Sequence, residues 1–339
     1  MVKSPTRLSL ARTPTPLQPL PTLSEAWGID LWVKRDDLTG AELSGNKIRK
    51  LEYLLADAES QQCDVIITTG AITSNHTRAA TLAARKRGLD AHLLLAGKKP
   101  PAQAQGNLQL ELLAGARVHY ITWREYRERI DELLRETAQR LRDEGRNPYI
   151  IPTGGSNEVG LWGYVNAFDE LNEQCHQHDI NPDAVVCAVG SGGTYAGLCL
   201  GNAMHQCPTH IYGVIVCNSN EYFAKKVHAD LQAVNLSLDQ PIDVPPQSNT
   251  LVDGYVAGGY AQTNEEQLRF LRTVAQKEAL ILDPVYTNKA LFGLRGLIQD
   301  QHIQPGSQVI FIHTGGIFGL PSFAGDFHQV WNQTEHWPN

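Results

Sequence analysis

One lysine of this chain stands where helices rarely place a lysine. Lys47 follows a Ser-Gly-Asn turn in the segment LSGNKIRKLEYL (43–54), whose apolar spacing predicts a helix over 47–59. The positive end of the helix dipole lies at this N-terminus and disfavours an ammonium group. Arg49 and Lys50 add positive charge, and neighbouring cations with partial desolvation lower the pKa of a lysine, which favours the neutral amine that a Schiff base requires. On composition alone, a solvated basic first turn is the more common explanation.

Three glycine-containing turns follow apolar segments, namely TTGAITSNHTR (68–78), PTGGSNEVG (152–160) and VGSGGTYAG (189–197). In open parallel sheets ligands collect where strands end and helices begin, because free backbone N–H groups and helix dipoles there favour anions. The third turn is the best phosphate candidate, since successive amides and two hydroxyls come from Ser191, Gly192, Gly193 and Thr194.

This third turn is not a nucleotide motif. Tyr195 stands where the third glycine of GxGxxG should fall, and the chain has no GxxxxGKS/T motif. A nucleotide-dependent oxidoreductase is therefore disfavoured. A tight strand-to-helix turn without a ligand remains the alternative to an anion site.

The elements that must position these residues alternate between strands and helices. Continuously apolar strands separated by helices predict parallel sheets covered on both faces, which is α/β architecture. We expect strands at 31–38, 64–70, 91–97, 117–121, 149–152, 184–189, 211–217 and 308–313, and helices at 47–59, 75–87, 107–114, 124–144, 158–175, 194–205, 265–279 and 288–300. The stretch 241–260 and the tail 321–339 show no period that predicts an element.

Composition narrows the class of function. The 339 residues suggest about two globular units, and a net charge of −7 provides no basic field for nucleic acid or an anionic membrane. A small-molecule partner is expected. The six cysteines form no CxxC pair, which favours buried free thiols, and no histidine pattern predicts a metal site. No apolar stretch is long enough to span a bilayer and no signal peptide pattern opens the chain, so we expect a cytoplasmic protein.

Five motifs occur in a fixed order along the chain: GNKxRKLEYL, GAxxSNHTR, SGGTxAG, LDPVYTNKAL and FIHTGG. Together they resemble the D-cysteine desulfhydrase and 1-aminocyclopropane-1-carboxylate deaminase family of pyridoxal-phosphate enzymes, which have the tryptophan synthase β-subunit fold (fold type II). The resemblance implies two open twisted α/β domains with the cofactor in the cleft. It places a large domain at 1–49 plus 161–339 and a small inserted domain at 50–160, and it implies a homodimer.

The resemblance also implies which residues bind the cofactor, pyridoxal 5'-phosphate. Lys47 would carry it, and Asn75 would hydrogen-bond its phenolic oxygen. The turn from Ser191 through Gly192 and Gly193 to Thr194 would hold its phosphate, with Lys50 as a nearby charge. Thr314 would face its pyridine nitrogen.

Substrate contacts follow from the same resemblance. Ser74, with the backbone amides of Asn75 and His76, would hold the substrate carboxylate. Tyr286 would lie beside the cofactor and Tyr260 on the substrate side, so the catalytic set is Lys47, Ser74 and Tyr286. Without the resemblance, Asn75 would be read as a helix N-cap and Tyr286 as a buried core ring.

The reaction expected from the resemblance is α,β-elimination, most simply of D-cysteine to pyruvate, sulfide and ammonia. In the deaminase branch a Glu follows the tyrosine of DPVY and a Leu stands in the HxGG motif, whereas this chain has Thr287 and Thr314. This pair fits the desulfhydrase branch and predicts weak or no deaminase activity. Departures from the family pattern at Ser44, Thr73 and Ala261 leave open an L-cysteate sulfo-lyase or another β-substituted amino-acid lyase. A catalytically silent cofactor-binding homologue is a separate alternative, and the presence of Lys47, Ser74 and Tyr286 together argues against it.

Overall fold

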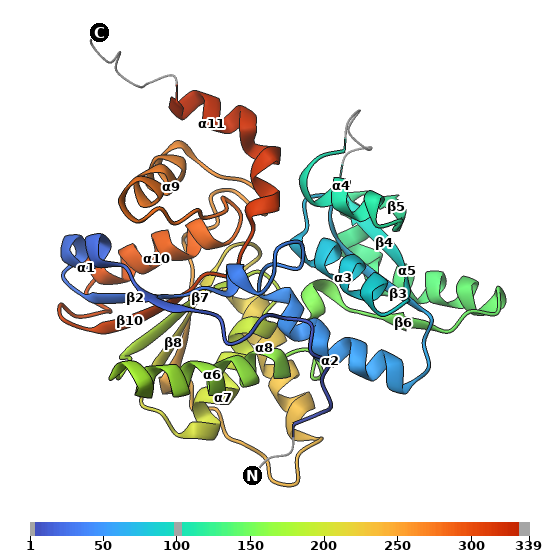
Figure 1. Cartoon of the computed structure of the whole chain (residues 1–339), viewed down its shortest axis with the longest axis horizontal. Helices are drawn as coiled ribbons and strands as arrows, with labels where there is room; N and C mark the ends of the chain where they lie inside the picture. The colour runs from blue at the N-terminus through green and yellow to red at the C-terminus, as the bar shows by residue number, and fades with distance from the viewer. Residues whose placement is uncertain (1–3, 98–103, 332–339) are drawn as a thin grey trace.

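The computed structural model describes residues 4–97 and 104–331, and its strands form two separate sheets (Figure 1). The larger sheet contains, in spatial order, β1 (Leu17–Pro19), β2 (Asp30–Lys34), β10 (Gln308–Ile312), β7 (Ala184–Val189), β8 (His210–Ile215) and β9 (Asn249–Val252). β1 pairs antiparallel with β2, and all other neighbours are parallel. The carboxyl ends of β7 and β10 therefore lie at the same edge.

The smaller sheet is entirely parallel. Its spatial order is β5 (Arg117–Ile121), β4 (Asp90–Ala96), β3 (Val65–Ala71) and β6 (Pro148–Ile150). Every residue of β3 is buried, and the same is true of β7 in the larger sheet. Strands buried on both faces need no polar alternation, which explains their continuous apolar runs. The predicted α/β architecture with parallel sheets is confirmed.

Helices cover both sheets. Around the larger sheet, α1 (Pro21–Trp27) and α10 (Thr287–Gln299) lie on one side, and α6 (Trp162–His178) and α7 (Gly193–His205) on the other (Figure 1). On β3 of the smaller sheet, Ile66 packs in one hydrophobic cluster with α2 (Lys47–Ser60) and α3 (Asn75–Lys86), whereas Val65 and Ile67 pack in another with α5 (Trp123–Asp143). The remaining helices are α4 (Gly106–Leu113), α8 (Asn220–Asn235), α9 (Glu265–Glu278) and α11 (Ala324–Trp331).

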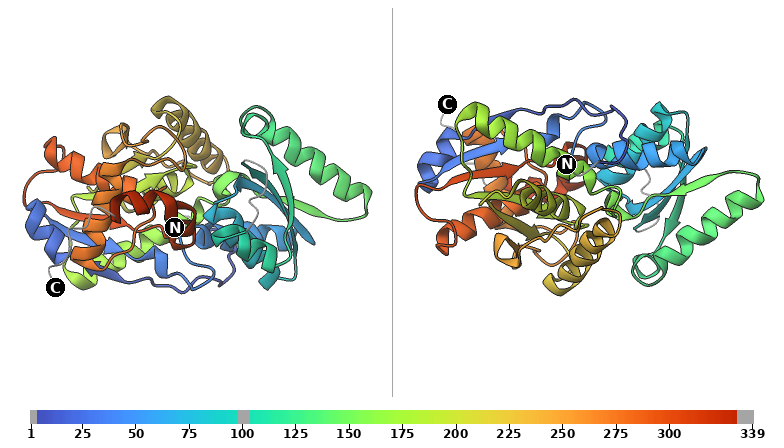
Figure 2. Two further views of the ribbon diagram at one scale, coloured as in Figure 1. Left: turned by 90° about the horizontal axis from the view of Figure 1, so that it is seen from above. Right: turned by 90° about the horizontal axis from the view of Figure 1, so that it is seen from below.

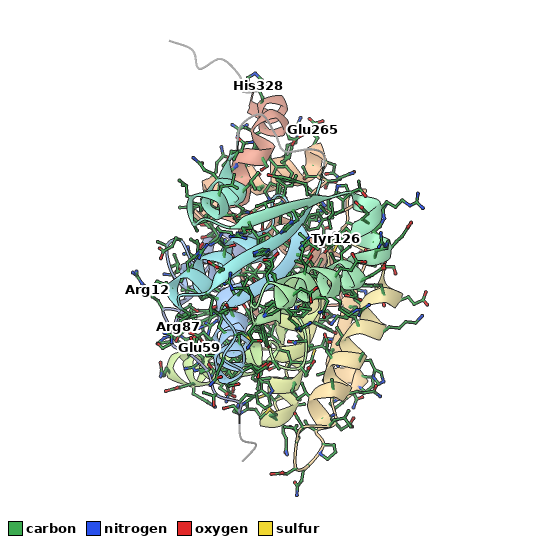
Figure 3. All side chains as sticks on the ribbon, turned by 90° about the vertical axis from the view of Figure 1, so that its right-hand side faces the viewer. Arg12, Glu59, Arg87, Tyr126, Glu265 and His328 are labelled. Carbon is green, nitrogen blue, oxygen red and sulfur yellow. The ribbon has the colours of Figure 1, made fainter. Side chains whose placement is uncertain are left out.

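Each sheet with its helices forms one body, a large one around the six-stranded sheet and a small one around the four-stranded sheet. The two bodies lie side by side along the long axis of the molecule, and helix α2 (Lys47–Ser60) connects them (Figure 2). It contacts α6 of the large body and α3 of the small one. At the far end of α2, Glu59 forms a surface ion pair with Arg87 at the end of α3 (Figure 3). Because α2 runs unbroken through residue 50, the exact domain boundary there remains a proposal.

Several elements differ from the sequence expectation. The strand expected at 31–38 ends at Lys34, because the carboxylate of Asp36 turns inward to Arg49 (2.8 Å) and a short 3-10 helix follows at Asp36–Leu38. α8, β9 and α11 occupy regions where the sequence predicts no element, and so do β1 and α1. β9 is a partly exposed edge strand, so its pattern lacks a buried run.

Two further predictions concern the cysteines and the length of apolar helices. All six cysteines are free thiols, and five of them are buried, as expected. Within 4–97 and 104–331, no helix combines the length and the apolar character that crossing a membrane requires.

Candidate active site

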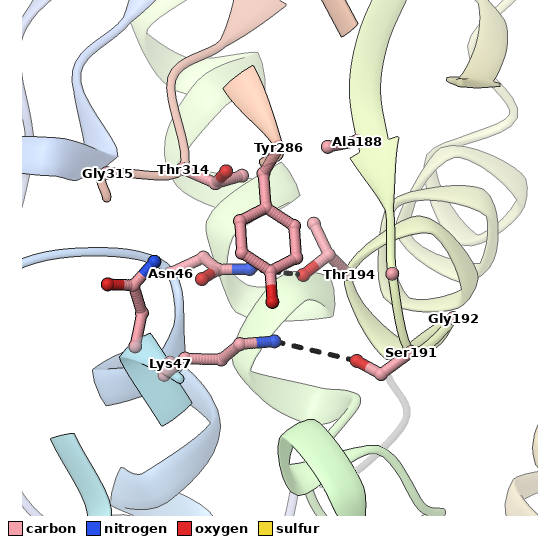
Figure 4. Close-up of a pocket in the computed structure, with 11 residues that line it drawn as sticks. Asn46, Lys47, Ala188, Ser191, Gly192, Thr194, Tyr286, Thr314 and Gly315 are labelled. Atoms are coloured by element: carbon pink, nitrogen blue, oxygen red, sulfur yellow. Dashed lines mark hydrogen bonds between the residues drawn. The ribbon is translucent and has the colours of Figure 1, made fainter. Parts of the chain in front are cut away.

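A pocket opens where β7 and β10 end and where α2, α3, α7 and α10 begin (Figure 4). The space it encloses, including its open mouth, is about 390 Å³. Its walls combine a lysine, a tyrosine, two side-chain amides, three serine or threonine side chains and three glycines. The lining residues are Asn46, Lys47, Asn75, Ala188, Gly190, Ser191, Gly192, Thr194, Tyr286, Thr314 and Gly315.

Lys47 is the first residue of α2, and its side chain points into the pocket. Its Nζ lies 3.5 Å from Ser191 Oγ (Figure 4). Burial lowers the pKa of Lys47 to about 8, which agrees with the direction expected from the sequence. The cause is desolvation rather than the neighbouring cations. A lysine with this pKa is partly neutral at physiological pH and can act as a nucleophile.

The turn after β7 requires glycine at two positions. Gly192 has φ 89°, which is left-handed, and a Cβ on Gly190 would come within 2.8 Å of the Tyr286 ring. Helix α7 starts directly after this turn, so its free N–H groups and dipole favour an anion here. Thr194 Oγ1 accepts a hydrogen bond of 2.9 Å from Asn46 Nδ2, which ties the turn to the start of α2.

Ser156, from the second glycine-containing turn, stands behind the phosphate candidate turn. Its hydroxyl donates to Ser191 Oγ (2.9 Å) and accepts from the N–H of Gly193 (3.2 Å). It also accepts from Lys50 Nζ at 3.0 Å. The Gly193 amide is therefore already bonded within the protein, whereas Ser191, Gly192 and Thr194 line the pocket.

Lys50 does not line the pocket. Its side chain is completely buried, and its Nζ donates to Gly154 O (3.3 Å) as well as to Ser156. Burial and the nearby Lys47 and Lys226 hold the pKa of Lys50 well below its usual value. A Cβ on Gly193 would lie 2.9 Å from this Nζ, so the amine lies directly behind the turn.

The start of α3 brings three predicted residues together in different roles. Asn75 lines the pocket, and Ser74 caps the helix by accepting from the N–H groups of His76 (3.2 Å) and Thr77 (3.3 Å). The His76 ring is buried and faces Thr68, whose hydroxyl donates to Ile151 O. His76 Nε2 must therefore donate to Thr68. Burial and two nearby lysines hold the pKa of His76 well below its usual value.

Two tyrosines meet at the side of the pocket. The hydroxyls of Tyr286 and Tyr260 lie 2.7 Å apart, and burial raises the pKa of both. Both hydroxyls therefore stay protonated at neutral pH. The Tyr260 ring also lies beside Trp123 at the start of α5, with ring centroids 6.1 Å apart. Tyr260 thus joins Tyr286 to the small body.

The two threonines that distinguish the family branches occupy different environments. Thr314 lines the pocket, and its carbonyl accepts from the N–H of Asn46 at 3.1 Å. Thr287 is fully buried, and its hydroxyl bonds to the Asp283 carboxylate (2.8 Å). Only Thr314 is therefore in a position to contact a pocket ligand.

Sequence reasoning missed four lining residues. Asn46, Gly190 and Gly315 lie inside or next to the quoted motifs, so their proximity in sequence was a usable signal. Ala188 carries no chemical signal, because a small side chain inside an apolar strand is common. Ser156 lies in the second glycine-containing turn, and the sequence predicts no site role for it.

These features fit a ligand with a phosphate, an aldehyde and a pyridine ring. The start of α7, beside the hydroxyls of Ser191 and Thr194 that line the pocket, favours an anion such as a phosphate. Lys47 offers an amine that an aldehyde could bond, and Asn75 and Thr314 offer polar groups to a ring bound between them. Pyridoxal phosphate has all three parts.

Comparison with known proteins agrees with this chemistry. A family model described as pyridoxal-phosphate dependent enzyme matches residues 8–315. The mitochondrial bifunctional D-cysteine desulfhydrase/1-aminocyclopropane-1-carboxylate deaminase of Arabidopsis thaliana is 41% identical over 324 residues, covering 92% of this chain and 78% of that protein. A D-cysteine desulfhydrase of Klebsiella pneumoniae (strain 342) is 39% identical over 318 residues, covering 91% of this chain and 94% of that protein.

A solved structure of an ACC (1-aminocyclopropane-1-carboxylate) deaminase homologue superimposes with a TM-score of 0.87 at 37% identity, covering 97% of both chains. The expected fold type II architecture is thereby confirmed, and so is the cofactor. These relatives and the matched family model show that the chain belongs to the D-cysteine desulfhydrase and 1-aminocyclopropane-1-carboxylate deaminase family of pyridoxal-phosphate dependent enzymes.

Proposed function

We propose that this enzyme catalyses α,β-elimination of a β-substituted amino acid, with D-cysteine as substrate and pyruvate, sulfide and ammonia as products. When bound, pyridoxal phosphate supplies the electron sink that makes the substrate Cα proton acidic. The protein must then remove that proton, hold the substrate carboxylate and protonate the leaving sulfur.

Lys47 is proposed as the lysine that binds the cofactor and as the base at Cα. Once the substrate amine is in place, the Lys47 amine would be free, and its pKa of about 8 would leave it partly neutral, as a base must be. Lys47 Nζ would take the proton from Cα, and the electron pair of the Cα–H bond would become the Cα=Cβ bond as the sulfur leaves Cβ.

Ser74 is proposed as the carboxylate-binding residue. Its Oγ accepts from two backbone N–H groups, so its own proton is the part of the hydroxyl left to donate to a carboxylate. Its place at the N-terminus of α3 adds the helix dipole, which favours a negative group.

The Tyr286–Tyr260 pair is proposed as the proton donor for the leaving group. The Cβ–S bond breaks with its electron pair on sulfur, and sulfur takes a proton from this hydroxyl pair. The raised pKa of both tyrosines keeps that proton available at neutral pH. Hydrolysis of the released enamine by water gives pyruvate and ammonia.

The observation that carries the choice of D-cysteine is Thr314. It lines the pocket, and the family resemblance puts its hydroxyl, in place of a carboxylate, opposite the pyridine nitrogen. A neutral hydroxyl does not hold a proton on that nitrogen, so the electron sink is weaker. Elimination of a good leaving group such as sulfide needs only brief stabilisation at Cα, whereas opening a cyclopropane ring needs more.

Deaminase activity is the second candidate, and similarity to named relatives favours it. The Arabidopsis relative carries both activities in its name, and the superimposed structure is of an ACC deaminase homologue. These relatives are about as similar to the chain as the desulfhydrases are. The two activities must therefore be distinguished by the products that the enzyme forms.

A product screen on the cofactor-loaded enzyme tests the proposal. The substrates are D-cysteine, L-cysteine, L-cysteate, D-serine, β-chloro-D-alanine and 1-aminocyclopropane-1-carboxylate. We expect D-cysteine to react fastest, with equal amounts of pyruvate and sulfide. Robust 2-oxobutanoate from the cyclopropane substrate would favour the deaminase instead, and pyruvate with sulfite from L-cysteate would favour a sulfo-lyase.

The Lys47→Ala variant serves as the control. It should lose both product formation and the visible absorption band of the cofactor bound to lysine. A wild-type protein that shows the band but converts none of the six compounds would instead be a silent cofactor-binding homologue.

A further inference from the structure

Asn107 lies on α4, outside the pocket, yet it is bonded to a residue that lines it. The side chain of Asn107 is 2% exposed. Its Nδ2 donates to Asn75 Oδ1 at 2.9 Å and to the backbone oxygen of Thr73 at 2.8 Å. Both hydrogens of the Asn107 amide are therefore used.

The orientation of this amide is fixed at both ends. Arg78 Nε, which can only donate, bonds to Asn107 Oδ1 at 2.9 Å. The Thr73 carbonyl, which can only accept, bonds to the opposite side of the amide. Burial lowers the pKa of Arg78 to about 10, so it stays charged at neutral pH. A flipped Asn107 would place donor against donor and oxygen against oxygen.

This bonding fixes the orientation of the Asn75 side-chain amide. Because Asn107 donates an N–H to Asn75, Asn75 must accept with its Oδ1. Its own NH₂ group is then left for other partners, and Asn75 is a lining residue of the pocket. An N–H donor suits an anionic oxygen, whereas the opposite orientation would bring a carbonyl oxygen against it.

We infer that Asn107 and Arg78 are positioning residues that hold Asn75 with its N–H group toward the phenolic oxygen of the cofactor. The inference rests on the proposed contact between Asn75 and that oxygen. It extends the site by two side chains that touch neither cofactor nor substrate.

Arg78 also connects this chain of bonds to the lysine segment. Its guanidinium donates to the backbone oxygens of Ser44 (2.9 Å) and Glu42, in the segment that leads to Lys47. The same group lies over the Phe318 ring, 4.8 Å from its centroid. The buried Arg78 guanidinium thus bonds both to Asn107 and to the segment that precedes Lys47, so it fixes their relative positions.

The Asn107→Asp variant tests the polarity. An aspartate has nearly the same size and keeps a partner for Arg78, but it cannot donate. Asn75 should then turn its NH₂ toward residue 107 and its oxygen toward the cofactor. We expect the dissociation constant for pyridoxal phosphate to rise roughly tenfold, from loss of one buried hydrogen bond and a new repulsion, together with a shift of the visible band of the bound cofactor.

The Asn107→Leu variant separates polarity from packing. Leucine removes every side-chain hydrogen bond of residue 107 but lets the Asn75 amide take either orientation. The cofactor should therefore bind more tightly to the Leu variant than to the Asp variant. Thermal unfolding of the cofactor-free proteins should show the opposite order, because leucine leaves Arg78 Nε without its acceptor. A purely structural role predicts the same order in both measurements.

A double-mutant cycle completes the test. In the Asn75→Ala background, Asn107→Asp should change neither the affinity for pyridoxal phosphate nor the band. Three results would overturn the inference: wild-type affinity and band in Asn107→Asp, an equal loss in the Asn75→Ala background, or wild-type affinity in Asn75→Ala itself. If the Asp variant does not fold, the Leu variant runs the same cycle.

These measurements use only cofactor and protein. A failure of the D-cysteine proposal would therefore leave their outcome unchanged, and a failure here would leave the substrate screen unchanged.

Discussion

Burial sets the protonation states around the pocket more than ion pairing does. Desolvation is the largest cause of the lowered pKa values of Lys47 and His76 and of the raised pKa of Tyr286. In each case the neutral form is favoured. The pocket therefore has an amine and a phenol in its wall and an imidazole behind it, all favoured in their neutral forms by burial, which suits proton transfer by the first two.

The lowered pKa of Lys47 predicts how fast the cofactor-free protein takes up pyridoxal phosphate. Only the neutral amine attacks the aldehyde, so the rate should rise with pH and level off above about 8. At pH 7, roughly one Lys47 in ten is neutral, whereas an ordinary lysine has fewer than one in a thousand. Stopped-flow absorbance of the visible band, measured from pH 6 to 10, gives this profile.

Two results bear on that prediction. A rate that keeps climbing through pH 10 would show that Lys47 has an ordinary pKa. The Lys47→Ala variant provides the baseline, since it should give no band at any pH.

Single residues were predictable where a motif marks them. The expected residues that line the pocket are Lys47, Asn75, Ser191, Gly192, Thr194, Tyr286 and Thr314. Lys50, Ser74, His76 and Gly193 belong to the same motifs but are not among the lining residues, and neither is Tyr260, which lies outside the five motifs. The bond between Asn46 and Thr194 joins positions 148 residues apart, and such a contact depends on the fold and not on local spacing.

At the scale of elements, glycines allow helices to approach at backbone distance. Gly163 in α6 faces the first turn of α2, where a Cβ would lie 2.4 Å from Arg49 O and 2.6 Å from Lys50 N. The neighbours are backbone atoms, which cannot turn aside as a flexible side chain does. The position of Lys47 therefore depends on a glycine in another helix.

The Gly163→Ala variant should be destabilised by about 1–3 kcal/mol, because overpacking forces the two helices apart. It should also bind pyridoxal phosphate more weakly, since the displaced turn carries Lys47. Chemical denaturation and cofactor titration measure the two effects.

The matched control is Gly325→Ala in α11, where a Cβ meets nothing within 4 Å. It should leave cofactor binding unchanged and stabilise the helix by about 0.5–1 kcal/mol. Equal unfolding midpoints for Gly163→Ala and the wild type would contradict the backbone contact.

A buried lysine orders the loop that carries Tyr260. Lys289, one turn after Tyr286 in α10, is fully buried, and its Nζ donates to the backbone oxygens of Val256 (2.7 Å) and Gly259 (3.0 Å). The backbone of this loop has positive φ at Ala257, Gly258 and Ala261. One helix end thus presents Tyr286 to the pocket and holds the loop that brings Tyr260 to it.

Elements with long buried runs were predictable, and partly exposed ones were not. α8 could have been found, because Phe223, Val227 and Val234 follow helical spacing after Ser219, whose side chain caps the helix. β9 and α11 gave weaker signals, since each buries few side chains. Their place is decided by the sheet edge and by packing on α9, which no local pattern encodes.

At the scale of the whole molecule, the pocket draws residues from both bodies. Asn75 belongs to the helix that packs on the four-stranded sheet, whereas Ser191, Thr194 and Thr314 follow strands of the six-stranded sheet. Lys47 starts the helix between them. A cofactor bound to all of these residues would connect the two bodies through contacts that the chain alone does not make.

Removing pyridoxal phosphate should therefore destabilise both bodies. A ligand that binds only the folded protein adds about 2.7 kcal/mol of stability at a free concentration of 100 times its dissociation constant. The unfolding midpoint should fall when the cofactor is removed by an amine that traps it, and it should return on reconstitution. Lys47→Ala should show a smaller change, because its cofactor is held without the covalent bond.

Hydrogen exchange decides whether the coupling reaches both bodies. Exchange should rise on cofactor removal at the start of α3, near Asn75, as well as at the start of α7, near Thr194. The far end of α5, around Arg140, makes no pocket contact and should exchange at the same rate in both forms. If protection from hydrogen exchange changed only beside the six-stranded sheet, the small body would contribute nothing to cofactor binding. That result would also contradict the proposed role of Asn75.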